Sequence, residues 1–163
     1  MPRRSAGLLL YRWNDAALEV LIVHPGGPFW ANKDAGAWSI PKGEYDDAED
    51  ALAAAQREFG EELGRPAPDG AYVALGTVRQ KGGKEVVAWA IEAAVDVAAL
   101  VSNTFEIEWP PRSGRRQEFP EVDRAEWCSL DVARRRLIAA QVEFVDRLLD
   151  HIGAHRSRDG HAD

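Results

Sequence analysis

Apolar positions in the first third of the chain follow the spacing that is typical of strands. Residues 5–12 are rich in Leu and Tyr, and residues 18–24 read LEVLIVH. Asn14 and Asp15 lie between the two segments and supply turn chemistry, so the pattern predicts a hairpin. Residues 25–36, which hold three Gly together with Pro and Asn, are expected to form a loop.

The longest helical pattern follows this loop and ends at Gly64. On a wheel of about 100° per residue, one stripe is apolar and is expected to be buried: Leu52, Ala55, Phe59 and Leu63. Asp46 or Asp47 can cap the start of the helix, and Gly64 followed by Pro66 is expected to stop it.

The second half of the chain alternates strand patterns with polar turns. We expect further strands at residues 71–80, 85–95, 105–109 and 125–128. Residues 110–123 are interpreted as a polar loop. Ser129 can cap a last helix, whose apolar positions are Leu137, Phe144, Val145, Leu148, Leu149 and Ile152.

Strands with one helix inserted early and another at the end indicate an α/β fold with a mixed sheet sandwiched between helices. The length of 163 residues fits one domain. We expect that domain to cover residues 1–152 and to be followed by a flexible C-terminal tail, residues 153–163.

The net charge of −7 disfavours an extended nucleic-acid surface, because proteins that hold a duplex by its phosphates are usually basic. An acidic protein can still bind a small polyanion if metal ions lie between the two. The single cysteine, Cys128, cannot form an internal disulfide, which suits a reducing, cytoplasmic setting. It is expected to be a small buried hydrophobe. No stretch of the chain approaches membrane-spanning length.

The candidate chemistry lies on the first helix, where Glu58, Glu61 and Glu62 share an arc of about 100°. Like charges at this spacing destabilise a helix by about 0.2–0.5 kcal/mol per pair, and the helix dipole disfavours anions in the last turns. A divalent cation removes both penalties. Oxygen ligands in this number suit Mg²⁺, or alternatively Mn²⁺. The plain alternative is a solvated acidic helix face.

The spacing of the fixed positions favours the metal site, because the segment resembles the box of the Nudix hydrolase family. The pattern is Gly, five residues, Glu, seven residues, Arg-Glu, two residues, Glu-Glu, one residue and Gly, and it is met by Gly43, Glu49, Arg57, Glu58, Glu61, Glu62 and Gly64. Phe59 supplies the apolar residue after Glu58. The one departure is Arg65, where the family usually has an aliphatic residue.

The resemblance implies a Nudix-type α/β/α sandwich and a hydrolase that cuts phosphoanhydride bonds. By position in the box, it implies that Glu58, Glu61 and Glu62 are metal ligands. The backbone carbonyl of Lys42 is implied as a further ligand. It also implies that Arg57 orients a catalytic glutamate through an ion pair. Glu49 lies within about 80° of Arg57 on the wheel, so it is interpreted as a structural brace.

The implied reaction is attack by water on phosphorus, for which a base must deprotonate the water. Glu61 or Glu62 could serve as that base. The acids Glu118 and Glu121, outside the box, are alternatives, although a plain solvated loop charge is the favoured interpretation of both.

Cationic residues near the box are the candidates for binding a phosphate chain. All four lysines lie in segments near the expected site, and three are assigned to substrate binding: Lys42, Lys81 and Lys84. Backbone N–H groups around Gly82 and Gly83 could also bind an anion, and a solvated hairpin tip is the alternative. A basic loop beside Trp109 and Phe119 carries Arg112, Arg115 and Arg116. It could hold a phosphate tail and stack a base, and a solvated loop is the alternative.

Residues 38–43, WSIPKG, resemble the start of the box in diadenosine polyphosphate hydrolases. A dinucleoside polyphosphate such as Ap4A is therefore the first expected substrate. A nucleoside triphosphate, including an oxidised one as in MutT-type enzymes, is the second, and a nucleotide sensor without activity is a third reading. A monomer and a homodimer both stay open. The four histidines show no ligand spacing, and surface or cap roles are expected for them, including His24.

Overall fold

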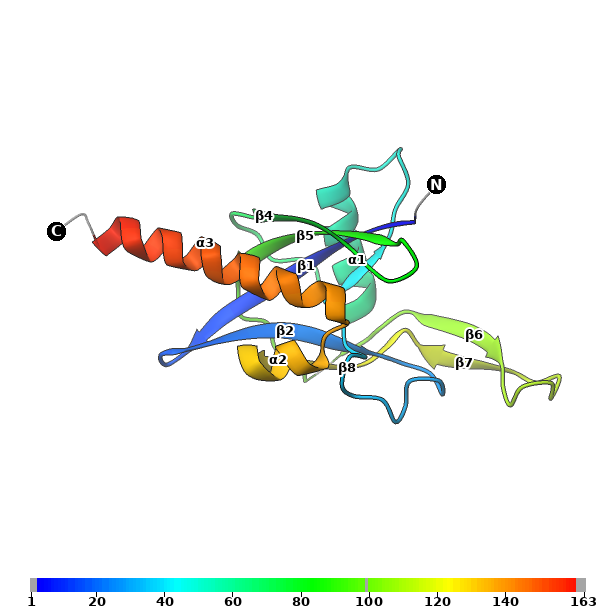
Figure 1. The fold of residues 1–163 in the computed structure, drawn as a ribbon. Helices are drawn as coiled ribbons and strands as arrows, with labels where there is room; N and C mark the ends of the chain where they lie inside the picture. The colour runs from blue at the N-terminus through cyan, green and yellow to red at the C-terminus, as the bar shows by residue number, and fades with distance from the viewer. Residues whose placement is uncertain (1–2, 99, 161–163) are drawn as a thin grey trace.

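Residues 3–98 and 100–160 are described by the computed structural model, in which a mixed sheet separates two layers of helices (Figure 1). The elements run in this order: β1 (Arg4–Asn14), β2 (Ala17–Pro25), β3 (Lys42–Glu44), α1 (Ala51–Leu63), β4 (Val73–Arg79), β5 (Glu85–Glu92), β6 (Thr104–Glu108), β7 (Arg116–Pro120), β8 (Val122–Ser129), α2 (Leu130–Arg136), the 3₁₀ turn η1 (Ala139–Gln141) and α3 (Val142–Gly160).

The main sheet has six strands in the order β4-β5-β1-β2-β8, and β3 also pairs with β1. The β1–β5 pair is parallel, whereas β1–β2, β1–β3, β2–β8 and β4–β5 are antiparallel. The predicted α/β sandwich with a mixed sheet is confirmed. Within the described residues, no helix is both long and apolar enough to cross a membrane.

Alternation along the central strand β1 divides the core between the two faces of the sheet. Leu8 and Leu10 are fully buried in a cluster with Phe59 of α1. Leu9, between them, is fully buried in the opposite cluster with Phe144 of α3. Successive side chains of a strand point to opposite faces, so a strand covered on both sides is apolar without interruption.

The predicted hairpins are confirmed, and so is the end of the box helix. β1 and β2 pair up to Asn14 and Ala17, and β4 and β5 pair around the turn at residues 80–84. Gly64 ends α1 in the left-handed conformation with φ of 69°, and its N–H donates to the Gly60 carbonyl. A residue with a side chain is disfavoured at such a position.

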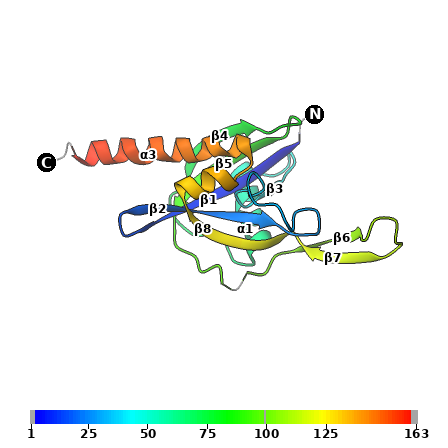
Figure 2. The ribbon, with the colours of Figure 1, turned by 60° about the horizontal axis from the view of Figure 1, so that its bottom comes forward.

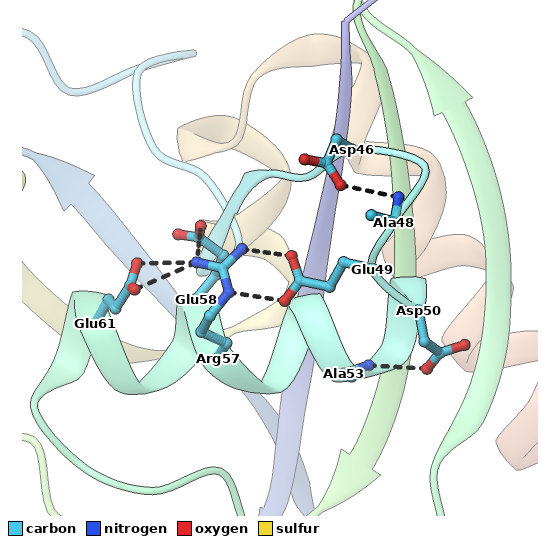
Figure 3. Close-up of polar contacts among 8 residues, drawn as sticks. All are labelled: Asp46, Ala48, Glu49, Asp50, Ala53, Arg57, Glu58 and Glu61. Atoms are coloured by element: carbon cyan, nitrogen blue, oxygen red, sulfur yellow. Dashed lines mark hydrogen bonds and ion pairs between the residues drawn. The ribbon is translucent and has the colours of Figure 1, made fainter.

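The predicted caps Asp46 and Asp47 are wrong, because α1 begins only after Asp50. The Asp50 carboxylate accepts from the Ala53 N–H at 3.1 Å. Asp46 instead accepts from the Ala48 N–H at 2.9 Å, which closes a local turn ahead of the helix (Figure 3). Short acidic side chains serve both purposes, so the sequence offered several equivalent starting points.

The prediction of a loop over residues 110–123 is wrong in part. β7 pairs with β6 in a separate two-stranded sheet, with Phe105 opposite Phe119. Figures 1 and 2 both show this ribbon extending away from the main sheet. Most of β7 is exposed and polar, which is why its sequence resembles a loop.

The prediction of a single last helix after Ser129 is also wrong, because this part of the chain forms two separate helices, α2 and α3. Ser129 caps α2 as predicted, accepting from the Val132 N–H. Leu137 then adopts an extended conformation and forms a bridge with Trp38, and η1 precedes α3. α3 continues to Gly160, within the segment for which a flexible tail is predicted, and residues 161–163 lie outside the described part of the chain.

Candidate functional site

The short strand β3 brings Gly43 against the middle of α1. β3 is held to β1 with Gly7 opposite Lys42, and the Leu8 N–H donates to the Pro41 carbonyl at 3.1 Å. A Cβ atom on Gly43 would lie 1.9 Å from the carboxyl carbon of Glu58. Gly43 therefore leaves the room into which the Glu58 carboxylate fits.

Arg57 holds the acids of α1 in place (Figure 3). Its Nε and Nη2 donate to the two carboxylate oxygens of Glu49, at 2.8 and 2.9 Å. Its Nη1 donates to Glu58 at 2.8 Å and to Glu61 at 3.2 Å. A planar guanidinium suits such a bidentate pair. This geometry agrees with a brace at Glu49, while the catalytic and metal-binding roles of the box residues stay predictions.

Two of the box acids lie where their negative charge is disfavoured. Burial raises the pKa of Glu58, against the opposing hydrogen bond from Arg57. Burial raises the pKa of Glu62 to about 8, against the opposing charge of Lys42. One Glu62 oxygen accepts from the Lys42 backbone N–H at 3.2 Å. Carboxylates in this state are strong candidates to receive a cation.

A fourth acid, Glu121, reaches the same place from the junction between β7 and β8. Burial and the charge of Glu61 raise the pKa of Glu121. The Glu121 charge in turn raises the pKa of Glu58 and of Glu62. Its backbone is fixed on both sides: the Glu121 N–H donates to the Asn103 carbonyl at 2.8 Å and its carbonyl accepts from Gly26 at 3.0 Å.

Two lysines from different segments meet beside these acids. Burial and, to a smaller extent, the neighbouring Lys84 ammonium lower the pKa of Lys42 to about 8. Lys84 comes from the β4–β5 turn, where Gly82 and Gly83 adopt positive φ. Lys81 is exposed on the same turn. Adjacent ammonium groups repel, so this pair is suited to an anion such as a phosphate chain.

A cavity of about 180 Å³ opens at this point of the structure. Its charged lining is Lys42, Glu62 and Glu121. The rest of its lining is mostly apolar: Val23, Pro25, Trp30, Ala37, Ser39, Val122 and Ile138. A cavity that combines apolar walls with a few convergent charged groups is the usual form of a small-molecule site.

His24 is bonded to the loop at residues 26–36, from which Trp30 lines the cavity. The surface or cap role predicted for His24 is wrong, because this histidine is buried. Its side chain is fully buried, with Nδ1 2.8 Å from an Asp123 carboxylate oxygen. Its Nε2 is 2.7 Å from the Lys33 carbonyl. The ring also contacts Trp38 edge to face. His24 therefore joins the loop to β8.

The three arginines of the predicted basic loop lie at the far end of the β6–β7 ribbon, and none of them lines the cavity among the described residues. All three are exposed, and Arg116 pairs with Glu106 at 3.1 Å. Glu118, also on the ribbon, accepts from Thr104. The substrate role of Arg112, Arg115 and Arg116 stays a prediction that the cavity does not explain.

The carboxyl groups of Glu62 and Glu121, both lining residues of the cavity, are of the kind that suits a hard divalent ion. Within residues 3–98 and 100–160, however, no three His, Cys, Asp or Glu side chains already face one another at metal-binding spacing. Glu58 and Glu61 instead point to Arg57 (Figure 3). The ligand set therefore stays a prediction.

Sequence reasoning missed Trp30 and Gln141 and undervalued Glu121. Trp30 stands in a loop without periodicity, and Glu121 stands in a segment interpreted as solvated. Gln141 is a buried glutamine that bonds to the segment preceding the box. Each acts through contacts with residues distant in sequence, for which a single sequence carries no signal.

A mixed sheet between helices, with Lys42, Glu62 and Glu121 lining one cavity, is compatible with the hydrolase of phosphoanhydride bonds that the box implies. The family comparison agrees: a family model described as NUDIX domain matches residues 1–148. The chain belongs to the NUDIX family, and the predicted hydrolase class is confirmed. Members of this family generally use divalent metals such as Mg²⁺.

Solved structures share this fold at low sequence identity. An Ap4A hydrolase from C. elegans, in a binary complex, is 22% identical with a TM-score of 0.66, covering 92% of this chain and 98% of its own. The NUDIX domain of Shewanella oneidensis NrtR with ADP ribose is 17% identical with a TM-score of 0.63, covering 93% and 89%. A MutT protein from Methanosarcina mazei is 20% identical with a TM-score of 0.59, covering 92% and 95%. A comparison with curated proteins finds no match.

Proposed function

We propose that this NUDIX hydrolase is a Mg²⁺-dependent pyrophosphohydrolase of nucleoside polyphosphates, with a dinucleoside polyphosphate such as Ap4A as its first substrate. One observation carries the proposal: Glu62, Glu121 and Lys42 line a single cavity, with Glu58 and Glu61 of the same helix beside it. This arrangement pairs a carboxylate-rich region with cations suited to a phosphate chain.

Glu58, Glu61, Glu62 and the Lys42 carbonyl are the groups that would hold the divalent ion. A bound ion would offset the negative charge on the phosphate oxygens. Lys42 and Lys84 would bind the phosphate chain, and Arg57 would keep Glu58 and Glu61 in position through the contacts that it makes in the structure.

Glu121 is the group that we propose to take the proton from the attacking water, with Glu61 and Glu62 as alternatives. Its carboxyl lines the cavity and has a raised pKa, so its ionised form is a stronger base than an ordinary glutamate. Glu118, the other acid considered from sequence, lies on the ribbon and bonds to Thr104.

We expect Glu121→Gln to lower kcat by about 10²–10⁴-fold, while KM stays close to that of the unmodified chain. Glu118→Gln is the matched control, since it makes the same chemical change a few residues away and outside the cavity, and it should leave kcat unchanged. Steady-state rates of both variants with Mg²⁺ give the comparison. Full activity of Glu121→Gln would show that Glu121 is not the base and would favour Glu61 or Glu62 of α1.

The substrate ranking follows from the fold likeness to an Ap4A hydrolase and from the WSIPKG segment at residues 38–43. A nucleoside triphosphate, ordinary or oxidised, is the second candidate and is supported by the likeness to a MutT protein. Binding without cleavage is the third, because a NUDIX domain of similar fold is complexed with ADP ribose.

A substrate panel tests the proposal. Ap4A, ordinary and oxidised triphosphates, nucleotide sugars and capped RNA are incubated with Mg²⁺, with and without a chelator, and products are identified by mass spectrometry. We expect metal-dependent cleavage of Ap4A into mononucleotides. Faster turnover of a triphosphate would favour the second candidate, and tight binding without products would favour the third. Heavy-oxygen water then reports which phosphorus is attacked.

A cytoplasmic location and a monomeric or homodimeric state stay proposals. Cys128 is free and buried, in agreement with the small hydrophobe predicted from sequence.

A further inference from the structure

Trp30 is an exposed aromatic side chain that lines the cavity holding Lys42, Glu62 and Glu121. The large hydrophobic side chains that are exposed in the described part of the chain include two neighbours on one loop, Phe29 at 60% and Trp30 at 40%. Trp30 lines the cavity together with Lys42, Glu62 and Glu121. Phe29 is not part of that lining and contacts Trp109 of the ribbon edge to face, with ring centres 5.4 Å apart.

The position of Trp30 is fixed by turns on both sides and by anchors at both ends of its loop. The Trp30 carbonyl accepts from the Lys33 N–H at 3.0 Å, and the Lys33 carbonyl is bonded to the buried His24. At the other end, the Gly26 N–H donates to the carbonyl of Glu121. A preorganised binding residue loses little conformational entropy when the ligand binds.

The cavity is small and largely apolar on the side of this loop. Pockets for drug-sized ligands measure about 300–1,000 Å³, so the cavity of about 180 Å³ holds only part of a nucleotide. The charged lining residues are Glu62 of the box, Lys42 just before the box, and Glu121, whereas Ala37 and Ile138 join Trp30 as apolar lining. A flat, apolar portion of the substrate is the part that matches this lining.

The Lys33 ammonium lies 5.0 Å from the centre of the Trp30 ring. This contact keeps a positive charge beside the cavity residue Trp30, where it favours an anionic ligand. An aromatic ring with a cation beside it serves both parts of a nucleotide, since the ring can stack a base and the cation attracts its phosphates.

We infer that Trp30 is a substrate-binding residue that stacks the nucleobase nearest to the acids, while Lys42 and Lys84 bind the adjoining phosphates. The inference rests on the proposed function for the cleavage chemistry and adds the group that recognises the aromatic end of the substrate. Stacking is tolerant of the base, because every base has a flat face. Trp30 therefore contributes affinity for nucleosides in general.

Trp30→Leu is expected to raise KM for Ap4A and for nucleoside triphosphates by about tenfold, the size of a typical base–aromatic stack. Trp30→Phe should retain most of the affinity, and kcat should stay close to that of the unmodified chain. Inhibition by inorganic triphosphate, which has no base, should not change. Phe29→Leu is the matched control: it removes the neighbouring exposed aromatic ring and should leave KM unchanged.

Adenosine binding without metal, followed by quenching of tryptophan fluorescence, gives a readout that does not need turnover. We expect the quenching to be lost in Trp30→Leu and kept in Phe29→Leu. The inference is overturned if Trp30→Leu binds adenosine as the unmodified chain does, or if it weakens Ap4A and inorganic triphosphate equally. A chain that binds adenosine through Trp30 but cleaves no panel member would refute the proposed function alone.

Discussion

The Glu62→Gln variant is expected to fold and to lose kcat by about 10²–10⁴-fold on every accepted substrate. Glu62 lines the cavity and lies beside Lys42 and Glu121, so its carboxyl is placed where the metal ion and the phosphate chain are expected to bind. Glutamine keeps the oxygen that accepts from the Lys42 backbone N–H, so the junction between β3 and α1 remains. The measurement is steady-state turnover with Mg²⁺.

The same substitution should leave the metal-free protein at least as stable above pH 8. The pKa of Glu62 is raised by burial to about 8, so the folded state favours the protonated carboxyl. Stability from this group is present at low pH and is lost as the pH rises toward 8. Glutamine does not titrate, so the variant does not lose this stability as the pH rises. The variant does lose the charge interaction between Glu62 and Lys42. We expect the Tm difference, variant minus unmodified, to increase from pH 5 to pH 8.5, as measured by thermal melts with chelator.

Glu118→Gln is again the matched control, because it changes an exposed glutamate of the β6–β7 ribbon. It should alter neither kcat nor the pH dependence of Tm. Undiminished turnover by Glu62→Gln would show that the assigned role is wrong, even if the chain still requires Mg²⁺.

The box helix could be predicted from the sequence because its information is local. Glu58, Glu61 and Glu62 share a face through helical spacing alone, and Gly64 marks the end of α1 through its own backbone preference. Apolar runs bounded by turn residues likewise indicated the main-sheet strands other than β3. The start of α1 was harder to locate, since three nearby aspartates have the same capping chemistry and only packing selects Asp50.

Contacts between distant segments could not be predicted in the same way. Glu121 enters the site because β7 pairs with β6 and because its carbonyl accepts from Gly26, 95 positions away by residue number. Trp30 lines the cavity because His24 and Glu121 hold its loop. The polarity of these segments is that of ordinary loops, so pattern reasoning assigned them to solvent.

The C-terminal region shows how such a contact can support the site. Gln141 of η1 is fully buried, and its Oε1 accepts from the Ile40 N–H at 2.9 Å. Its Nε2 donates to the Ser39 hydroxyl at 3.1 Å and to the Gln80 side chain at 2.9 Å. Ser39 and Ile40 lead directly to Lys42, and the Gln80 N–H bonds to the Lys84 carbonyl at 2.7 Å. Gln141 thus links the two segments that carry the paired lysines.

Gln141→Met is expected to lower the free energy of unfolding by about 1–3 kcal/mol, because the substitution keeps the approximate shape and leaves the buried Ile40 N–H without its acceptor. For a chain of this size that corresponds to a fall in Tm of about 2–12 °C. We also expect KM for a nucleotide to rise more than kcat falls, since the separation of Lys42 and Lys84 is no longer fixed.

Gln117→Met is the matched control, because Gln117 lies on the exposed β7 and bonds to the Trp109 carbonyl. It should change neither Tm nor KM by a comparable amount. Thermal melts and steady-state kinetics at a temperature well below both Tm values separate stability from substrate binding. A lower Tm with an unchanged KM would mean that Gln141 stabilises the fold without positioning the lysines. A raised KM in a fully folded sample would establish that a residue outside the box, on the turn before the last helix, sets the phosphate-binding geometry of this hydrolase.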